Sequence, residues 1–227
     1  MKFELALILR NKRLKQTLLI SVYFIGFIYF QIFSSDFFAN SAICRIVFYP
    51  MVISMAGCIY AQYFFSIEAN YINKLLTIPL SLEIILYKKY YLYSLISLIM
   101  VILLLPTSIQ GVTILEFITY YIMGIGILLF IAFQTSRFST KKLDLQMGNF
   151  MNWQGTNMSQ YLISCIGYII FFLIVIGLSF LLTTEELYYT MIILSFLLII
   201  THRIWLSNLA KYYIKNRYNK IKMGNED

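Results

Sequence analysis

The sequence predicts an all-α integral membrane protein, and three observations point to that class. Of the 227 residues, 60% are hydrophobic and 12% are charged, with a mean hydropathy of +0.77, whereas a soluble domain is nearer a quarter charged. Apolar runs recur at roughly the 20 residues that span a bilayer as a helix. The cations gather in a few segments between these runs. We therefore expect one transmembrane domain over residues 1–227 and no separate soluble domain.

Six apolar runs are long enough to be spanning helices. In chain order they are Thr17–Phe33, Ile46–Phe65, Tyr90–Pro106, Val112–Phe133, Tyr161–Leu182 and Leu187–Trp205.

The charges between the runs predict the orientation. Of the 18 lysines and arginines, only Arg45 falls on the side that holds Asp36, Glu116, Glu185 and Glu186. Because loops rich in lysine and arginine stay in the cytoplasm, both termini are expected there, as six spans require. The net charge of +8 is thus a topology signal and gives no indication of nucleic-acid binding.

Both ends of the chain are expected at the inner membrane surface. Residues 1–16 combine an apolar start with a basic cluster at Arg10, Lys12, Arg13 and Lys15, which suits an interfacial helix on anionic headgroups. An ordinary charged flank before the first span explains the same cations. Residues 206–227 form a basic, aromatic tail that we expect to lie on the surface.

Residues 66–89 are the stretch around which the chain is organised. Ser66 and Glu68 suit a helix start, and Pro79 ends that helix. Ser81 and Glu83 suit a second start, which enters the membrane after Lys88 and Lys89. The first helix can be a connector resting on the lipid interface, or a handle by which a soluble partner moves the membrane part. Its apolar positions at helical spacing include Tyr71, Leu75 and Leu76.

Residues 134–160 are the longest polar stretch and are expected on the same inner side, where they offer a partner a second contact. On the outer side, Glu116 lies within the first turn of the fourth run. An acid at that depth is costly unless it meets water or a partner. Two interpretations stay open: Glu116 lines a translocation path, or it sits at headgroup level in water.

The sequence lacks the usual signatures of catalysis. It has no GxxxxGK[ST] nucleotide loop, its single His202 has no acid beside it, and Cys44, Cys58 and Cys165 have no paired spacing. Glu185-Glu186 is followed by none of the arginine and histidine motifs of the prenyl-protein (CAAX) proteases. We expect no catalytic, metal or cofactor site in this chain.

Three segments resemble a family of uncharacterised bacterial membrane proteins related to ABC-2 exporters and regarded as ABC-transporter permeases. The first is RNKR at residues 10–13, the second FFSIEANYINKLLTIPLSLEIILYKKYYLY, and the third TSRFSTKKLDLQMGNFMNWQGTNMSQYL. The matching positions that the resemblance assigns to ATPase coupling are Ser66, Glu68, Tyr71, Leu75, Leu76, Asp144, Trp153 and Gln154.

The resemblance implies a permease subunit in a bacterial inner membrane. Residues 66–79 would dock into a separate ABC ATPase, which would hold ATP and Mg²⁺, and residues 1–16 would be the interfacial elbow. A second permease chain, identical or related, would complete the transporter, and the substrate would be a hydrophobic or amphipathic lipid or peptide. The alternative is a non-transporting scaffold or regulatory subunit that recruits a cytoplasmic partner.

Overall fold

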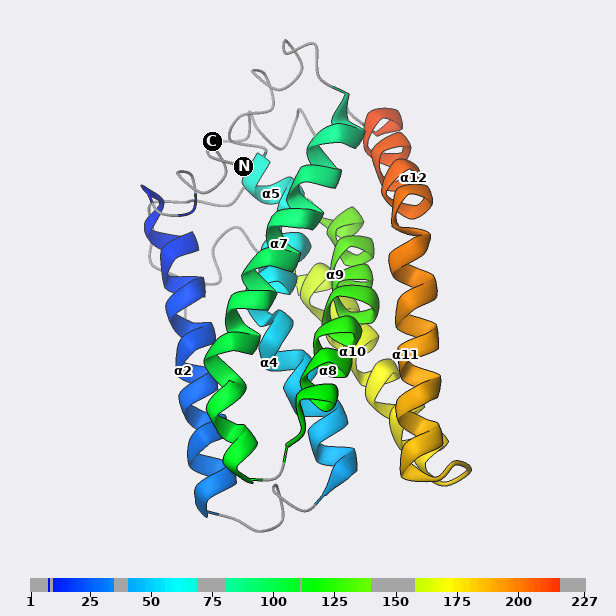
Figure 1. The fold of residues 1–227 in the computed structure, drawn as a ribbon. Helices are drawn as coiled ribbons and strands as arrows, with labels where there is room; N and C mark the ends of the chain where they lie inside the picture. The colour runs from blue at the N-terminus through cyan, green and yellow to red at the C-terminus, as the bar shows by residue number, and fades with distance from the viewer. Residues whose placement is uncertain are drawn as a thin grey trace.

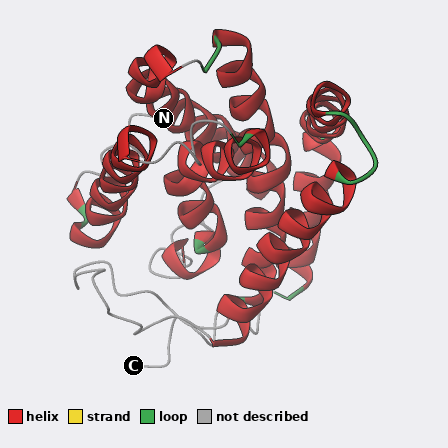
Figure 2. Cartoon of the chain, turned by 90° about the horizontal axis from the view of Figure 1, so that it is seen from below, coloured by secondary structure: helices red, strands yellow, loops and turns green. Residues whose placement is uncertain are grey.

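The computed structural model describes residues 8, 10–34, 41–68, 81–110, 112–139 and 158–216, and these residues form helices and short connections. Figure 1 shows the long helices running side by side between the two ends of the molecule. Figure 2, which looks along this direction, shows no strand among the described residues. The all-α prediction is confirmed. The elements are α2 (Lys12–Ser34), α4 (Ala42–Gln62), α5 (Phe64–Glu68), α7 (Leu82–Leu104), η2 (Leu105–Gln110), α8 (Ile114–Met123), η3 (Gly124–Leu128), α9 (Leu129–Thr135), η4 (Ser136–Phe138), α10 (Met158–Ser179), α11 (Thr184–Ile200) and α12 (His202–Lys215).

Four helical stretches of the described residues are long and apolar enough to cross a membrane: Ala42–Gln62, Leu82–Ser108, Ile114–Phe138 and Met158–Ser179. A fifth is added if α11 and α12, which meet at an angle of 54°, count as one broken span. Helix α2, which contains the predicted span Thr17–Phe33, is not among these candidates. The structure thus supports a helical, membrane-type protein with four to five candidate spans, and the count of six stays a prediction.

One expected helix start is observed, and one expected helix end differs from the observed one. Helix α7 begins at Leu82, with Ser81 at its N-cap and Glu83 in its first turn, as the second start predicted. The apolar run expected to reach Trp205 instead breaks at Thr201, and the chain continues as α12. Buried aromatic packing holds this last helix against the bundle, because Trp205 and Tyr213 point into the core. The beginning of the predicted surface-lying tail, up to Lys215, is therefore half embedded in the protein.

Helix α4 is the centre of the bundle and packs against α2, α7, α8, α9 and α10. Pro50 lies inside it, and the carbonyl of Pro50 accepts a hydrogen bond of 2.7 Å from the Ser54 hydroxyl. Gly57 permits the close approach of α7: a Cβ there would lie 3.2 Å from the Cβ of Tyr93. Small residues at such contacts are typical of packed membrane helices.

The helical stretch Ile114–Phe138 is interrupted halfway by a π-helical segment, η3, between α8 and α9. A Cβ on Gly126 in this segment would lie 2.5 Å from the carbonyl oxygen of Ser195 in α11. Only glycine leaves room for a backbone at that distance, so this position sets how closely α11 approaches.

Candidate functional site

The two segments expected to face a partner leave the bundle at one place. The Ser66 hydroxyl in α5 hydrogen-bonds the Ser139 hydroxyl after η4. The side-chain Nε2 of Gln160, at the start of α10, donates to the carbonyl of Gln62 over 2.6 Å. All four residues are buried. We name Gln62, Ser66, Ser139 and Gln160 the loop junction, since it joins the bases of residues 66–89 and 134–160.

Helix α12 braces the loop junction through aromatic contacts. The ring of Tyr213 stacks on Phe65 with centroids 4.2 Å apart, and the Arg137 guanidinium lies 5.4 Å from the centre of the Tyr212 ring. Stacked rings and cation–π pairs each add a modest stabilisation to the area they bury. A displacement of Phe65 or Arg137 would therefore also displace α12.

The predicted coupling residues are only partly within the described structure. Tyr71, Leu75, Leu76, Asp144, Trp153 and Gln154 lie outside the described residues. Ser66 was expected to cap an exposed helix, and this is wrong: α5 already begins at Phe64, and the Ser66 side chain is buried against Ser139. Helix α5 begins before Ser66 because the rings of Phe64 and Phe65 both pack into the core. Glu68 is the last residue of α5.

The six cations expected at the membrane interface divide into two groups. Arg10, Lys12, Lys15 and Lys88 are exposed, and their contact with headgroups stays a prediction.

Arg13 and Lys89 are each only 3% exposed, so the surface position expected of them is wrong. The Lys89 ammonium lies 5.1 Å from the centre of the Phe64 ring, a contact that a headgroup-facing lysine would not make. Arg13 faces the end of α4, where its charge acts on the Tyr63 side chain.

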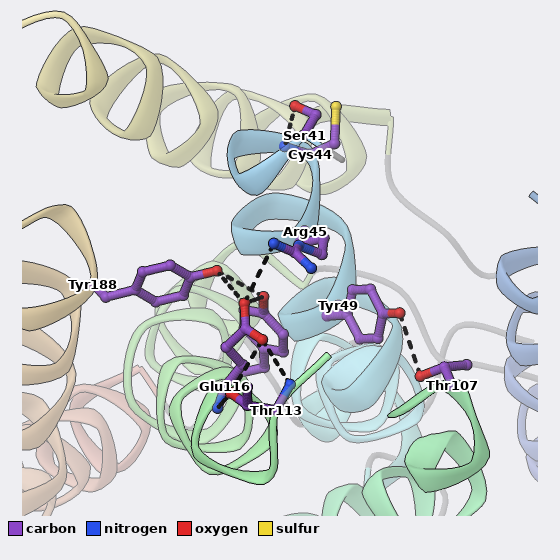
Figure 3. Close-up of polar contacts among 9 residues, drawn as sticks. Ser41, Cys44, Arg45, Tyr49, Thr107, Thr113, Glu116 and Tyr188 are labelled. Carbon is purple, nitrogen blue, oxygen red and sulfur yellow. Dashed lines mark hydrogen bonds and ion pairs between the residues drawn. The ribbon is translucent and has the colours of Figure 1, made fainter. Parts of the chain in front are cut away.

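A polar cluster joins α4, α8 and α11 at the opposite end of the bundle (Figure 3). Nη2 of the Arg45 guanidinium lies 3.6 Å from Oε1 of Glu116, and the two side chains are 17% and 16% exposed. The hydroxyls of Tyr188 and Tyr120 donate to the same oxygen over 3.0 and 3.4 Å. We call Arg45, Glu116, Tyr120 and Tyr188 the Arg45–Glu116 cluster.

The other carboxylate oxygen of Glu116 is used to start α8. Oε2 accepts hydrogen bonds from the backbone N–H of Thr113 over 2.7 Å and from its hydroxyl over 3.1 Å, while the backbone N–H of Glu116 donates to that hydroxyl. This is a capping box, and it places the acid at the positive end of the helix dipole. Glu116 therefore has one oxygen for its own helix and one for its neighbours. The carboxylate is thus paired with side chains of its own chain. That Glu116 lines a translocation path stays a prediction.

The family model that matches the chain covers residues 1–224 and is described as a family of unknown function, DUF5687. The chain belongs to this family. No curated protein and no solved structure matches it.

The Arg45–Glu116 cluster of the DUF5687 chain connects α4, α8 and α11, and its carboxylate is paired with a cation. The carboxylate is neutralised by Arg45, and every hydrogen bond it accepts is internal. Within the described residues, no group of three His, Cys, Asp or Glu side chains is arranged to hold a metal. The cluster is thus suited to hold α4, α8 and α11 in one arrangement.

Sequence reasoning treated Arg45 only as a cation on the outer side and missed the pairing. The signal for it was present, because Arg45 and Glu116 carry opposite charges one turn into their helices, on the same predicted side of the membrane. The T-x-x-E pattern at Thr113–Glu116 also predicts a capping box. Tyr188 gave no comparable signal, since its role depends on which face α11 presents to α8.

Proposed function

We propose that this chain is the transmembrane permease subunit of an ABC-type exporter, which couples ATP hydrolysis by a separate ATPase subunit to export of a hydrophobic or amphipathic substrate. The proposed topology has six spans and cytoplasmic termini in a bacterial inner membrane, with α2 as the first span. The charge distribution supports this orientation. Many of the outward-facing side chains of α2 are apolar, including Val22, Tyr23 and Phe27, as lipid contact requires.

The observation that carries the proposal is the loop junction. A soluble motor can move a membrane domain only if its contact segments are firmly attached to the spans. Residues 66–89 and 134–160 both leave from buried hydrogen bonds that include the end of α4, the central helix of the bundle. A push on either segment would act directly on α4, whose other end carries Arg45 in the Arg45–Glu116 cluster.

In the proposed mechanism, the ATPase binds ATP and Mg²⁺, and closure of its nucleotide-binding sites pushes the two segments. Helix α4 transmits the displacement to the Arg45–Glu116 cluster, which holds the outer ends of α8 and α11 together. Loss of that contact would let the outer end open, and a second permease chain would form the other half of the path. This follows the general rule that a ligand shifts a conformational equilibrium by its differential affinity for two states.

The test is a mild-detergent pull-down of the tagged protein from its native cells, followed by mass spectrometry and an ATPase assay of the complex. We expect a stoichiometric P-loop ATPase. Glu68→Arg together with Leu75→Asp should abolish its recovery. The matched control, Glu185→Arg with Leu181→Asp, places the same substitutions on exposed residues at the other end of the bundle and should leave recovery unchanged.

A second candidate is the non-transporting scaffold. It is favoured by the closed state of Glu116, which is already paired with Arg45 and offers no free charge to a passing substrate. A scaffold would retain a soluble partner without nucleotide turnover. Recovery of such a protein in place of an ATPase would refute the permease proposal.

A further inference from the structure

A groove of about 320 Å³ lies along α4, between α2 and α10. Its floor is one face of α4 from Phe48 to Gln62, and its walls include Phe24 of α2 and Tyr168 of α10. The lining is almost wholly apolar. At the rim, Phe24 is 43% and Met51 37% exposed, so the groove opens outward between the helices. We call it the α4 groove.

The surroundings of the α4 groove indicate its occupant. Both α4 and α10 are among the helices that can cross a membrane, and α10 exposes apolar residues such as Ile169 and Ile170. A groove that opens between spanning helices opens into lipid tails, and an apolar cavity does not hold water. From Phe48 to Gln62 the floor covers 15 residues, whose Cα atoms span about 21 Å of helix at 1.5 Å per residue. That exceeds the roughly 15 Å hydrocarbon depth of one leaflet, which gives room for an extended acyl chain.

One end of the α4 groove meets a basic segment. Near Gln62, the hydroxyl of Tyr60 donates to the carbonyl of Leu14 over 2.5 Å, so the first turn of α2 lies beside this end of α4. Lys12 and Lys15 of that turn are exposed, and so is Arg10 just before it. Exposed cations of this kind attract anionic headgroups at a membrane surface.

We propose that the α4 groove binds one anionic glycerophospholipid, with an acyl chain along α4 and the phosphate at Arg10, Lys12 and Lys15. The apolar groove supplies the seat for the chain, and the cations at its end select the charge of the headgroup. The proposal goes beyond the exporter function and applies equally to a permease and to a scaffold.

The experiment uses tryptophan quenching by lipids with brominated acyl chains in reconstituted vesicles. The reporter is Phe24→Trp, in a chain whose two native tryptophans are replaced by Trp153→Phe and Trp205→Phe. The matched control is Tyr23→Trp, because Tyr23 is the neighbouring residue of α2, is 78% exposed and does not line the groove. Both reporters are therefore at almost the same distance from the cations, and they differ in whether they face the groove.

We expect brominated phosphatidylglycerol to compete against phosphatidylcholine at Phe24→Trp with a preference of at least about fivefold, the effect of one cation near the surface. At Tyr23→Trp the preference should be near one. Lys12→Gln with Lys15→Gln should reduce the Phe24→Trp preference, leaving at most the contribution of Arg10. Arg10→Gln, which precedes α2, is the second variant if the double variant does not fold.

Three results would overturn the proposal. Equal quenching by the two lipids at Phe24→Trp would remove the selectivity, and equal preference at both reporters would show a general attraction around α2 with no seat in the groove. Quenching of Phe24→Trp by neither lipid would show that protein covers the groove, such as a second copy of the chain.

Discussion

The Arg45–Glu116 cluster offers the sharpest test of the structure, through substitutions that remove one charge at a time. Removing one partner of a fully buried ion pair costs about 3–5 kcal/mol, whereas exposed pairs contribute about 0.2–1 kcal/mol. Because the two side chains are 17% and 16% exposed, the cost here lies between these limits, at about 2 kcal/mol. Arg45→Met should lower the free energy of unfolding by that amount.

Glu116→Gln should cost somewhat more, about 2–3 kcal/mol, since hydrogen bonds to a charged group contribute more than those to a neutral one. Both tyrosine hydroxyls and the capping box depend on this carboxylate. In the double variant the two losses should not add, and we expect a coupling energy of about 1–2 kcal/mol for residues in direct contact.

The assay is SDS titration of the protein in mixed micelles, followed by far-ultraviolet circular dichroism. Glu185→Gln is the control, because Glu185 is an exposed acid in the first turn of α11 and should change the unfolding free energy by less than about 0.5 kcal/mol. If Glu116→Gln were no more destabilising than Glu185→Gln, or if the two single effects simply added, the cluster would not hold the helices together.

Two further predictions concern helix packing and the loop junction. Gly126→Ala should destabilise the protein by about 1–3 kcal/mol in the same titration, because the added methyl meets the backbone of α11, while Gly177→Ala, which adds a methyl in open space, should be close to neutral. In a chain without its three native cysteines, Ser66→Cys with Ser139→Cys should form a disulfide under mild oxidation, since the native hydroxyls are in contact; a mobility shift in non-reducing gels measures it. Ser66→Cys with Ser179→Cys is its control, as α10 separates Ser179 from the junction by about 30 Å, and equal cross-linking of both pairs would contradict the observed arrangement.

The loop junction shows where local patterns stop predicting structure. Ser66 followed by Glu68 resembles a helix start, yet α5 begins two residues earlier. The competing effect is burial of Phe64 and Phe65, which are each 1% exposed. Burying an aromatic ring of this size contributes more than an N-cap does, about 1.5–3 against about 1 kcal/mol.

The cations show the same limit. Lys88 and Lys89 are adjacent and carry the same charge, so the sequence pattern does not distinguish them. In the structure Lys88 is exposed, whereas Lys89 lies over the Phe64 ring. Successive residues of a helix point about 100° apart, so one of two neighbours can face solvent while the other faces the core. Which one does so depends on how α7 is rotated against α4.

The sequence by itself determined the class of this protein: all-helical, strongly apolar, with helix starts at Ser81 and at the Thr113–Glu116 capping box. These are properties of single segments, set by composition, apolar run length and capping residues within one turn. Only the tertiary structure decided that Arg45 pairs with Glu116, that Ser66 meets Ser139, and that Arg13 is buried. Such contacts join residues up to 73 positions apart, and they depend on which helices are neighbours and how each is rotated, which no local pattern records.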